Sequence, residues 1–236
     1  MRISFVKLLS ILLILFSASC NSQIKDSSAN EEIKRKASLL QDAVLFTYKS
    51  GDSTKLYTAY QLLVKENGFD KCVINPYYIR NVITILTLLK KYEKLDCILR
   101  NEKNNIDQEF REDLIDANEY SQYKDQNYSR AIEAINRTIK RYENKIVANP
   151  KDSLTEQKLF LTKVYIIGKN AMLKQIDSIA NLPLAKYSSN YYEILKYTIE
   201  KMPLDESLEN NIPNTKPESK LNNNTTNYPK AEIKIK

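Results

Sequence analysis

The stretch from Tyr123 to Asn144, YKDQNYSRAIEAINRTIKRYEN, decides the fold class of this chain. Within it and just after it, large apolar side chains recur in steps of three and four residues, at Ile132, Ile135, Ile139, Tyr142 and Ile146. This spacing follows the period of an α-helix and produces one apolar stripe along it. Because apolar surface is unfavourable in water, the stripe must pack against a neighbour. The stretch therefore predicts a helix over residues 129–148 inside a helical stack.

The composition is typical of a helical protein and leaves little for catalysis. The 236 residues include no His, no Trp, three Gly and seven Pro. Without His the chain has no imidazole base or ligand, and three glycines are too few for a phosphate-binding loop together with the turns of a β-rich fold. The remaining acid and base groups are carboxylates and Tyr. We therefore expect no enzyme, no cofactor and no metal centre.

Similar periodicity divides residues 31–203 into about nine helices. The segments IRNVITILTLL (79–89) and LFLTKVYII (159–167) are apolar on nearly every side, which predicts helices sandwiched between others. Ser153 with Glu156 fits a capping box, and Asn75 before Pro76 fits an N-cap followed by a first-turn proline. The expected spans are 32–50, 53–66, 76–91, 93–103, 107–125, 129–148, 154–168, 170–181 and 189–202.

Helix pairs recur along this region. Their second members begin near residues 53, 93, 129 and 170, a recurrence of about 36 to 41 residues that is typical of helical solenoids. Tyr57, Tyr92 and Tyr128 open the similar fragments, and we expect these rings to pack between helices. The pattern resembles the tetratricopeptide repeat, most closely over residues 123–144. The resemblance implies an all-α fold in which antiparallel helix pairs stack as a short right-handed solenoid.

The amino terminus reads MRISFVKLLSILLILFSASC, with a basic start, an apolar run and small residues before Cys20. The run is too short to span a bilayer, which needs roughly 20 apolar residues, and is typical of a secretion signal. The small residues before Cys20 resemble the lipobox of bacterial lipoproteins, which implies lipidation of Cys20 and removal of residues 1–19. Ser17 stands where that family has an aliphatic residue, so cleavage as an ordinary secreted protein stays open.

The lipobox resemblance sets the expected organisation and location. Residues 20–30 form a polar spacer, residues 31–203 the helical domain, and residues 204–236 an Asn-, Lys- and Pro-rich tail that we expect to be disordered. Lipid on Cys20 would hold the protein at a membrane of the bacterial cell envelope, facing the periplasm or the surface. Asn21, in place of the Asp that retains enterobacterial lipoproteins at the inner membrane, favours the outer membrane.

Two groups of side chains are candidates for a partner surface. Arg130, Arg137, Arg141 and Lys145 share one sector of the 129–148 helix, away from its Ile stripe, where they can meet solvent, anionic headgroups or an acidic partner. Tyrosines supply large rings with a polar end, which suits interfaces. The freer tyrosines are Tyr77, Tyr78, Tyr120, Tyr123, Tyr191 and Tyr192.

Two further patterns have more than one interpretation. Four carboxylates, on Glu109, Glu112, Asp113 and Asp116, share one side of the 107–125 helix, where they either complement the helix dipole or offer oxygen ligands. Cys72 and Cys97 are either two free thiols or a disulfide, which an oxidising envelope would permit. Their spacing cannot decide between these states.

These observations predict a lipid-anchored helical-repeat protein that binds a protein or peptide. The alternative is a lipoprotein that captures a glycan or solute for a transport system on a Tyr-lined surface. Removing Arg2 and Lys7 with the leader reduces 36 basic residues to 34 against 29 acidic ones, a net charge of +5. Since this charge is mild and not concentrated, we expect no nucleic-acid partner.

Overall fold

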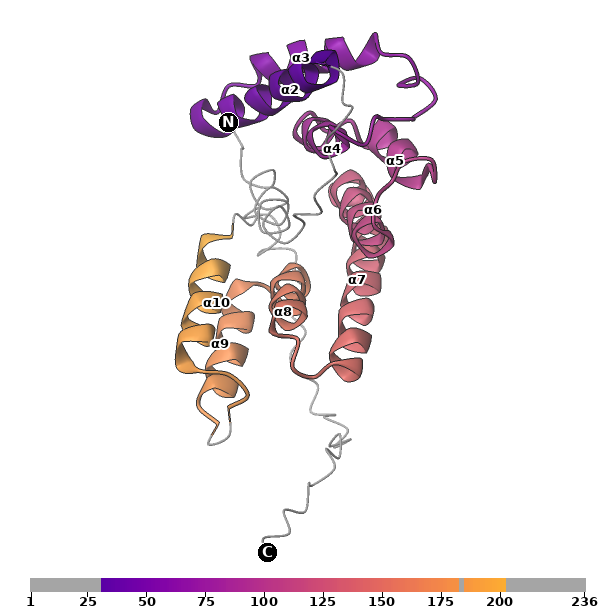
Figure 1. The fold of residues 1–236 in the computed structure, drawn as a ribbon. Helices are drawn as coiled ribbons and strands as arrows, with labels where there is room; N and C mark the ends of the chain where they lie inside the picture. The colour runs from indigo at the N-terminus through magenta and orange to yellow at the C-terminus, as the bar shows by residue number, and fades with distance from the viewer. Residues whose placement is uncertain (1–30, 183–184, 203–236) are drawn as a thin grey trace, which may run out of the picture.

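The structure, a computed structural model, describes residues 31–182 and 185–202, and every regular element in these ranges is an α-helix (Figure 1). The all-α prediction is confirmed for this part of the chain. The leader, Cys20, the spacer and the tail lie outside the described residues. Within the described part the helices are α2 (Glu31–Ser50), α3 (Thr54–Val64), α4 (Ile79–Leu88), α5 (Tyr92–Arg100), α6 (Gln108–Tyr123), α7 (Tyr128–Ala148), α8 (Ser153–Ile167), α9 (Lys169–Ala180) and α10 (Ser189–Lys201).

Two predicted helix caps are wrong, and the side-chain hydrogen bonds at each helix start give the reason. Helix α4 begins at Ile79 and not at Pro76, because the Asn75 side chain accepts from the Tyr77 amide at 2.9 Å and forms a separate turn. Helix α8 is capped by Asp152 and not by Ser153, since the Asp152 carboxylate accepts from the Thr155 amide at 3.0 Å. Asn and Asp side chains satisfy free amide groups in this way.

One glycine is needed by the segment between α3 and α4. Gly68 has a φ of 93°, and a Cβ there would lie 3.2 Å from the Val73 carbonyl oxygen. The Gly68 carbonyl accepts from the Val73 amide at 2.9 Å, which closes the turn. A side chain at this position would be strained in both backbone conformation and space.

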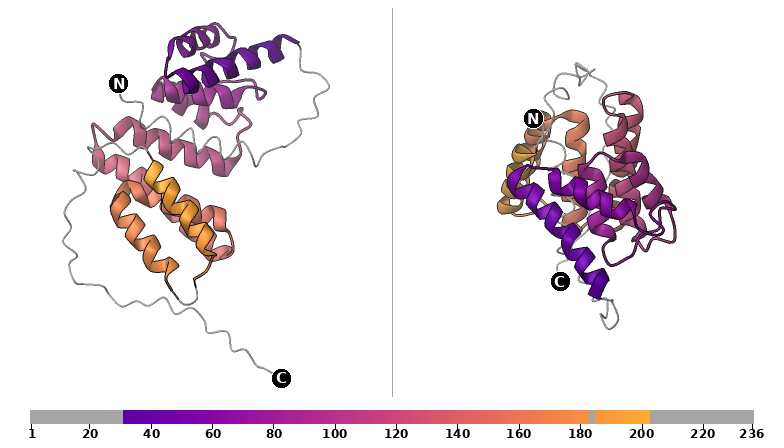
Figure 2. Two further views of the ribbon diagram at one scale, coloured as in Figure 1. Left: turned by 90° about the vertical axis from the view of Figure 1, so that its left-hand side faces the viewer. Right: turned by 90° about the horizontal axis from the view of Figure 1, so that it is seen from above.

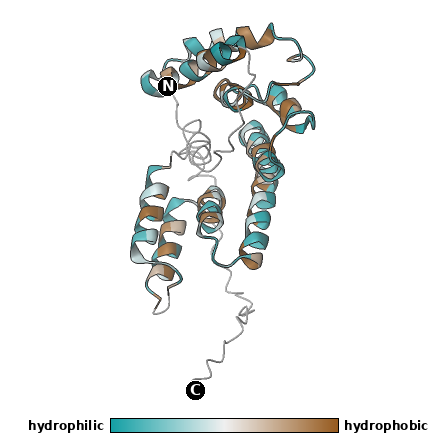
Figure 3. Cartoon of the chain, viewed as in Figure 1, coloured by the Kyte–Doolittle hydropathy of each residue, from teal (hydrophilic) through white to brown (hydrophobic). Residues whose placement is uncertain are grey.

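Successive helices pack on one another from α2 to α10, and α2 also packs on α4 and α8 on α10. Figure 2 shows α6 and α7 between the group α2–α5 and the group α8–α10. Helices α4 and α8 each contact three other helices, as predicted from their all-round apolar sequences. Along α7, α9 and α10 hydrophobic and hydrophilic residues alternate around the helix (Figure 3), so each has one face for the core.

The buried side chains form two core clusters that meet at α6. The first extends from Ala37 to Leu114 and the second from Tyr120 to Met202. Helix α6 contributes Leu114 to the first cluster and Tyr120 to the second. Helix α6 therefore links the two core clusters, and it packs against α7.

The tyrosines at the repeat positions differ in burial. Tyr92 and Tyr128 are half-buried at the starts of α5 and α7, and burial raises the pKa of both hydroxyls. Tyr57 is 54% exposed, so the expectation that its ring packs between helices is wrong. It lies on a flank of α3 and not on the face that carries the buried Leu56, Ala59 and Leu63.

Candidate functional site

The contact between α6 and α7 joins the two charged clusters that the sequence presented separately. Arg137 lies 2.7 Å from an Asp116 oxygen and 2.6 Å from a Glu119 oxygen, and Arg130 lies 2.7 Å from Glu119. Arg141 lies 2.8 Å from Asp113 and 2.6 Å from Asp116. The Lys145 ammonium pairs with Glu109. We call this set the α6–α7 ion network.

The network is partly buried, so loss of one partner would leave a charge without water to replace it. The Asp116 side chain is only 5% exposed and also accepts from the Thr138 hydroxyl at 3.1 Å. The Asp113 carboxylate accepts from the Tyr142 hydroxyl at 2.6 Å, and burial together with this carboxylate raises the pKa of Tyr142. A buried carboxylate needs several donors, because its charge has lost water.

At the edge of the α6–α7 ion network the arginine side chains are more exposed, and hydrogen bonds outweigh burial in setting the pKa of Glu119. Burial by itself would raise the pKa of Glu119, but hydrogen bonds from Arg130 and Arg137 overcome this effect and lower it. The side chains of Arg130 and Arg137 are 50% and 47% exposed. The guanidinium of Arg130 also lies 3.9 Å from the centre of the Tyr123 ring, a cation–π contact.

The predicted basic surface is therefore present on one face of α7, but that face meets α6. The expectation that it faces solvent is wrong for Arg141 and Lys145, which are 23% and 32% exposed against α6, whereas Arg130 and Arg137 stay about half exposed while they pair with it. The sequence held a signal for this pairing: two clusters of opposite charge, each on one side of its helix, lie on two helices joined by residues 124–127. Its role as a partner surface stays a prediction.

The carboxylates of α6 serve this pairing and do not converge on an ion. Within residues 31–182 and 185–202 no group of three or more Cys, Asp and Glu side chains is arranged to hold a metal. These carboxylates therefore complement the basic side chains of α7, in addition to the helix dipole.

The six candidate tyrosines do not form one surface. Tyr78, Tyr120 and Tyr192 are 2%, 1% and 2% exposed, so the expectation that these rings are free is wrong. Their rings complete the apolar cores, with Tyr78 in the first and the other two in the second. Tyr77 is 37% exposed, while Tyr123 and Tyr191 are half-buried.

Sequence reasoning missed Tyr187, which joins Tyr191 and Tyr192 in an aromatic cluster at the start of α10. The ring centres of Tyr187 and Tyr191 are 4.4 Å apart, and those of Tyr191 and Tyr192 are 5.3 Å apart. The Lys186 ammonium lies 4.8 Å from the Tyr187 ring and 2.8 Å from Glu156 of α8. Burial is the main cause that raises the pKa of Tyr191, whose hydroxyl donates to the Ser153 carbonyl at 3.2 Å. These contacts fasten α10 to the start of α8.

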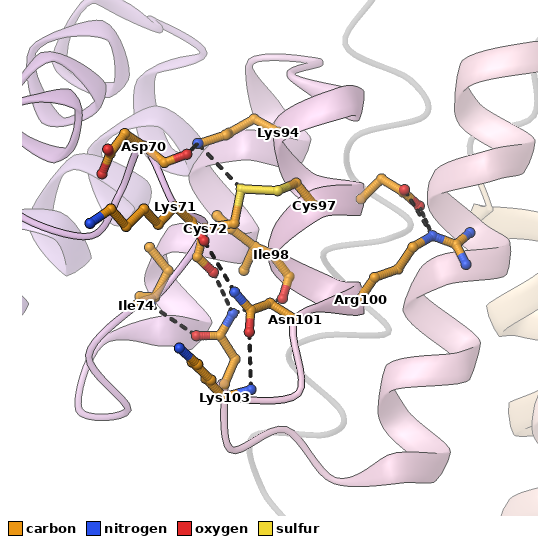
Figure 4. The surroundings of a disulfide bond; sticks show 12 residues. Asp70, Lys71, Cys72, Ile74, Lys94, Cys97, Ile98, Arg100, Asn101 and Lys103 are labelled. Carbon is orange, nitrogen blue, oxygen red and sulfur yellow. Dashed lines mark hydrogen bonds and ion pairs between the residues drawn. A yellow bond between two sulfur atoms is a disulfide. The ribbon is translucent and has the colours of Figure 1, made fainter.

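Of the two states considered for Cys72 and Cys97, the structure has the disulfide, with Cα atoms 5.8 Å apart (Figure 4). The bridge joins the segment before α4 to α5. Beside it, the fully buried Asn104 side chain accepts from the Ile74 amide at 2.9 Å and donates to the carbonyls of Cys72 and Ile98 at 2.8 and 2.7 Å. Together these contacts hold residues 65–78 against α5.

The α2–α3 hairpin exposes an apolar flank that the sequence analysis did not single out. The Lys55 ammonium lies 4.1 Å from the centre of the Phe46 ring, so these residues face each other across the hairpin. Leu39 lies seven residues before Phe46 on α2, and Leu62 lies seven residues after Lys55 on α3. Seven residues are about two helical turns, so both leucines lie further from the connection between these antiparallel helices. They are 49% and 43% exposed. We call Leu39, Phe46, Lys55 and Leu62 the first-hairpin flank.

Comparison with other proteins adds no family. No protein-family model, curated protein or solved structure matches the chain. None of the helices in the described ranges has the length and apolarity required to cross a membrane. Function therefore has to be argued from the helices, the leader sequence and the surfaces described above.

Proposed function

We propose that the protein is a lipid-anchored cell-envelope lipoprotein whose helix pairs form a divergent tetratricopeptide-like repeat and bind another protein or peptide. The leader and Cys20 support the anchor through their resemblance to the lipobox. Packing of each helix on the next, together with α2 on α4 and α8 on α10, supports the repeat. The function proposed for the helix pairs is binding of this partner.

The observation that carries the binding proposal is the first-hairpin flank. Leu39 and Leu62 are exposed, and their helical spacing from the Lys55–Phe46 contact brings them level with each other on α2 and α3, on the side that carries Phe46. Apolar anchors at spacings of one or two helical turns are how helix surfaces bind apolar peptide segments. The partner chemistry that fits is a peptide or helix with two or more large apolar side chains.

Site-specific crosslinking in the native envelope tests the proposal. A photoreactive amino acid is placed at Leu39 or Leu62, and matched controls carry it at Ser38 or Gln41, which are exposed on other sides of α2. We expect the same protein adduct from both flank positions, none from the controls, and its loss when the other leucine of the flank is changed to Asp. Equal adducts from all four positions, or none from the flank, would overturn the proposal.

Glycan or solute capture is the alternative, and one observation favours it. The aromatic cluster of Tyr187 and Tyr191 is half-buried beside Lys186 and Glu156, which supplies ring faces and polar groups together. Tyr78, Tyr120 and Tyr192 are enclosed in the two cores, which gives this alternative less support. Soluble oligosaccharides should raise the melting temperature of the unaltered protein, but not of a Tyr187→Ala variant, if this alternative holds.

A further inference from the structure

The two sulfurs of the Cys72–Cys97 disulfide have different surroundings. Cys72 is 1% exposed, within the first core cluster, whereas Cys97 is exposed on α5. Because the backbone of Cys97 lies inside a helix, the exposed part of this residue is mainly its side chain. A reagent in solution therefore reaches Cys97 before Cys72, and access decides which sulfur of a disulfide is attacked.

A positive charge stands beside the buried sulfur. The Lys94 ammonium lies 3.3 Å from the Cys72 Sγ atom, and it also donates to the Asp70 carbonyl at 3.3 Å (Figure 4). Its position is supported by the Phe69 ring, whose centre lies 4.6 Å away. An ammonium at this distance stabilises a thiolate on Cys72, and a stabilised thiolate is the better leaving group.

We propose that this bond is a thiol–disulfide exchange site in which Cys97 is the attacked sulfur and Cys72 is the leaving and resolving sulfur. The substrate class is a thiol or disulfide, either a small one or an exposed cysteine of another protein. This activity goes beyond the binding function proposed above and does not depend on it.

The exchange balances as follows for a thiol RSH. Its thiolate RS⁻ attacks Cys97 Sγ, a Cys97–S–S–R bond forms, and the Cys72–Cys97 bond breaks with its electron pair on Cys72 beside Lys94. A second RS⁻ attacks the R sulfur, which releases the Cys97 thiolate and RSSR. Two thiols are oxidised and the protein disulfide is reduced by two electrons. In reverse, the Cys97 thiolate attacks RSSR, and Cys72 then displaces RS⁻.

The sequence allows the attacked sulfur to be identified directly. Trypsin cuts the unaltered chain so that Cys72 lies in peptide 72–80, Cys97 in peptide 95–100 and Cys20 in peptide 8–25. The full chain is treated briefly with glutathione, quenched in acid, alkylated and mapped by mass spectrometry. We expect roughly tenfold more glutathione on peptide 95–100 than on peptide 72–80, and no such preference in guanidinium. Equal labelling of the folded protein, or more on Cys72, would overturn the proposal.

The role of Lys94 is tested by reduction rates. Lys94→Met keeps the apolar stem without the charge and should slow reduction roughly threefold to tenfold, because a leaving group of higher pKa departs more slowly. Lys94→Arg should keep most of the rate. The matched control is Lys91→Met, three residues away on the same segment, where the ammonium lies over Tyr60. A Lys94→Met variant that is reduced as fast as the control would overturn the assignment of Cys72 as the charge-stabilised leaving group.

Discussion

Replacing Arg141 by Met tests whether the basic face of α7 stabilises the fold through its contacts with α6 or serves only to bind a partner. The substitution keeps most of the apolar stem and removes the guanidinium that lies 2.8 Å from Asp113 and 2.6 Å from Asp116. These carboxylate side chains are 12% and 5% exposed, so little water can replace the lost donor. The free energy of unfolding should therefore fall.

The size of the fall follows from what remains. Removing one partner of a buried ion pair costs about 3–5 kcal/mol when the other charge is left unpaired. Here Asp116 keeps Arg137 and Thr138, and Asp113 keeps Tyr142. We therefore expect about 2–3 kcal/mol, which lowers the melting temperature by roughly 5–10 °C for a domain of this size.

Urea denaturation followed by far-ultraviolet circular dichroism measures this change. The matched control is Lys140→Met, an exposed residue beside Arg141 on the same helix, which should change stability by less than about 0.5 kcal/mol. In a double-mutant cycle Asp116→Asn should cost less in the Arg141→Met background than in the unaltered protein. If Arg141→Met and Lys140→Met have the same stability, the reasoning from the ion network is refuted.

Three further predictions concern the disulfide, its neighbouring loop and acid stability. Changing Cys97 to Ser should lower the free energy of unfolding by about 3.5 kcal/mol, because the disulfide closes a loop with a sequence separation of 25. Calorimetry without reductant measures this change, and an unchanged melting temperature would contradict it. Asn104→Ala should cost about 3 kcal/mol in urea unfolding, since it leaves the Ile74 amide and two carbonyls without their buried partner; a loss below about 1 kcal/mol would show that the loop is held by other contacts. Because the pKa of Glu119 is lowered in the folded protein, its contribution to stability is present above the unfolded pKa of about 4.3 and is lost as the pH falls through the folded pKa. Glu119→Gln should therefore flatten the acid side of the curve of unfolding free energy against pH. Parallel curves for the variant and the unaltered protein would contradict this.

Local patterns in the sequence were sufficient for the helices. The spans predicted from periodicity overlap all the helices of the described residues, and the sandwiched helices α4 and α8 were recognised because their sequences are apolar on nearly every side. The two wrong caps involve Asn75, whose side chain accepts from the Tyr77 amide in a separate turn, and Asp152, which caps α8 in place of its neighbour Ser153. Periodicity locates a helix, but it does not decide which neighbouring side chain satisfies its first amide groups.

The candidate surfaces were harder to predict because they depend on which faces meet. Considered alone, the acidic side of α6 was interpreted as complementing the helix dipole or binding a cation, and the basic side of α7 as a solvated face or partner surface. Tyr78, Tyr120 and Tyr192 read as free rings for the same reason, since nothing local says which tyrosines a core will enclose. The first-hairpin flank was missed because Leu39 and Leu62 lie in different helices and become neighbours only when the hairpin forms.

Residues close together along the chain were enough to establish the helical class and the approximate helix positions of the described residues, because helical periodicity is a local property. Only the tertiary structure decided that Arg141 serves Asp113 and Asp116 and that Cys72 is joined to Cys97. It also decided that Cys97 is exposed while Cys72 is buried beside Lys94. These properties depend on contacts between segments distant in sequence, and burial and charge pairing are set only when those segments pack together.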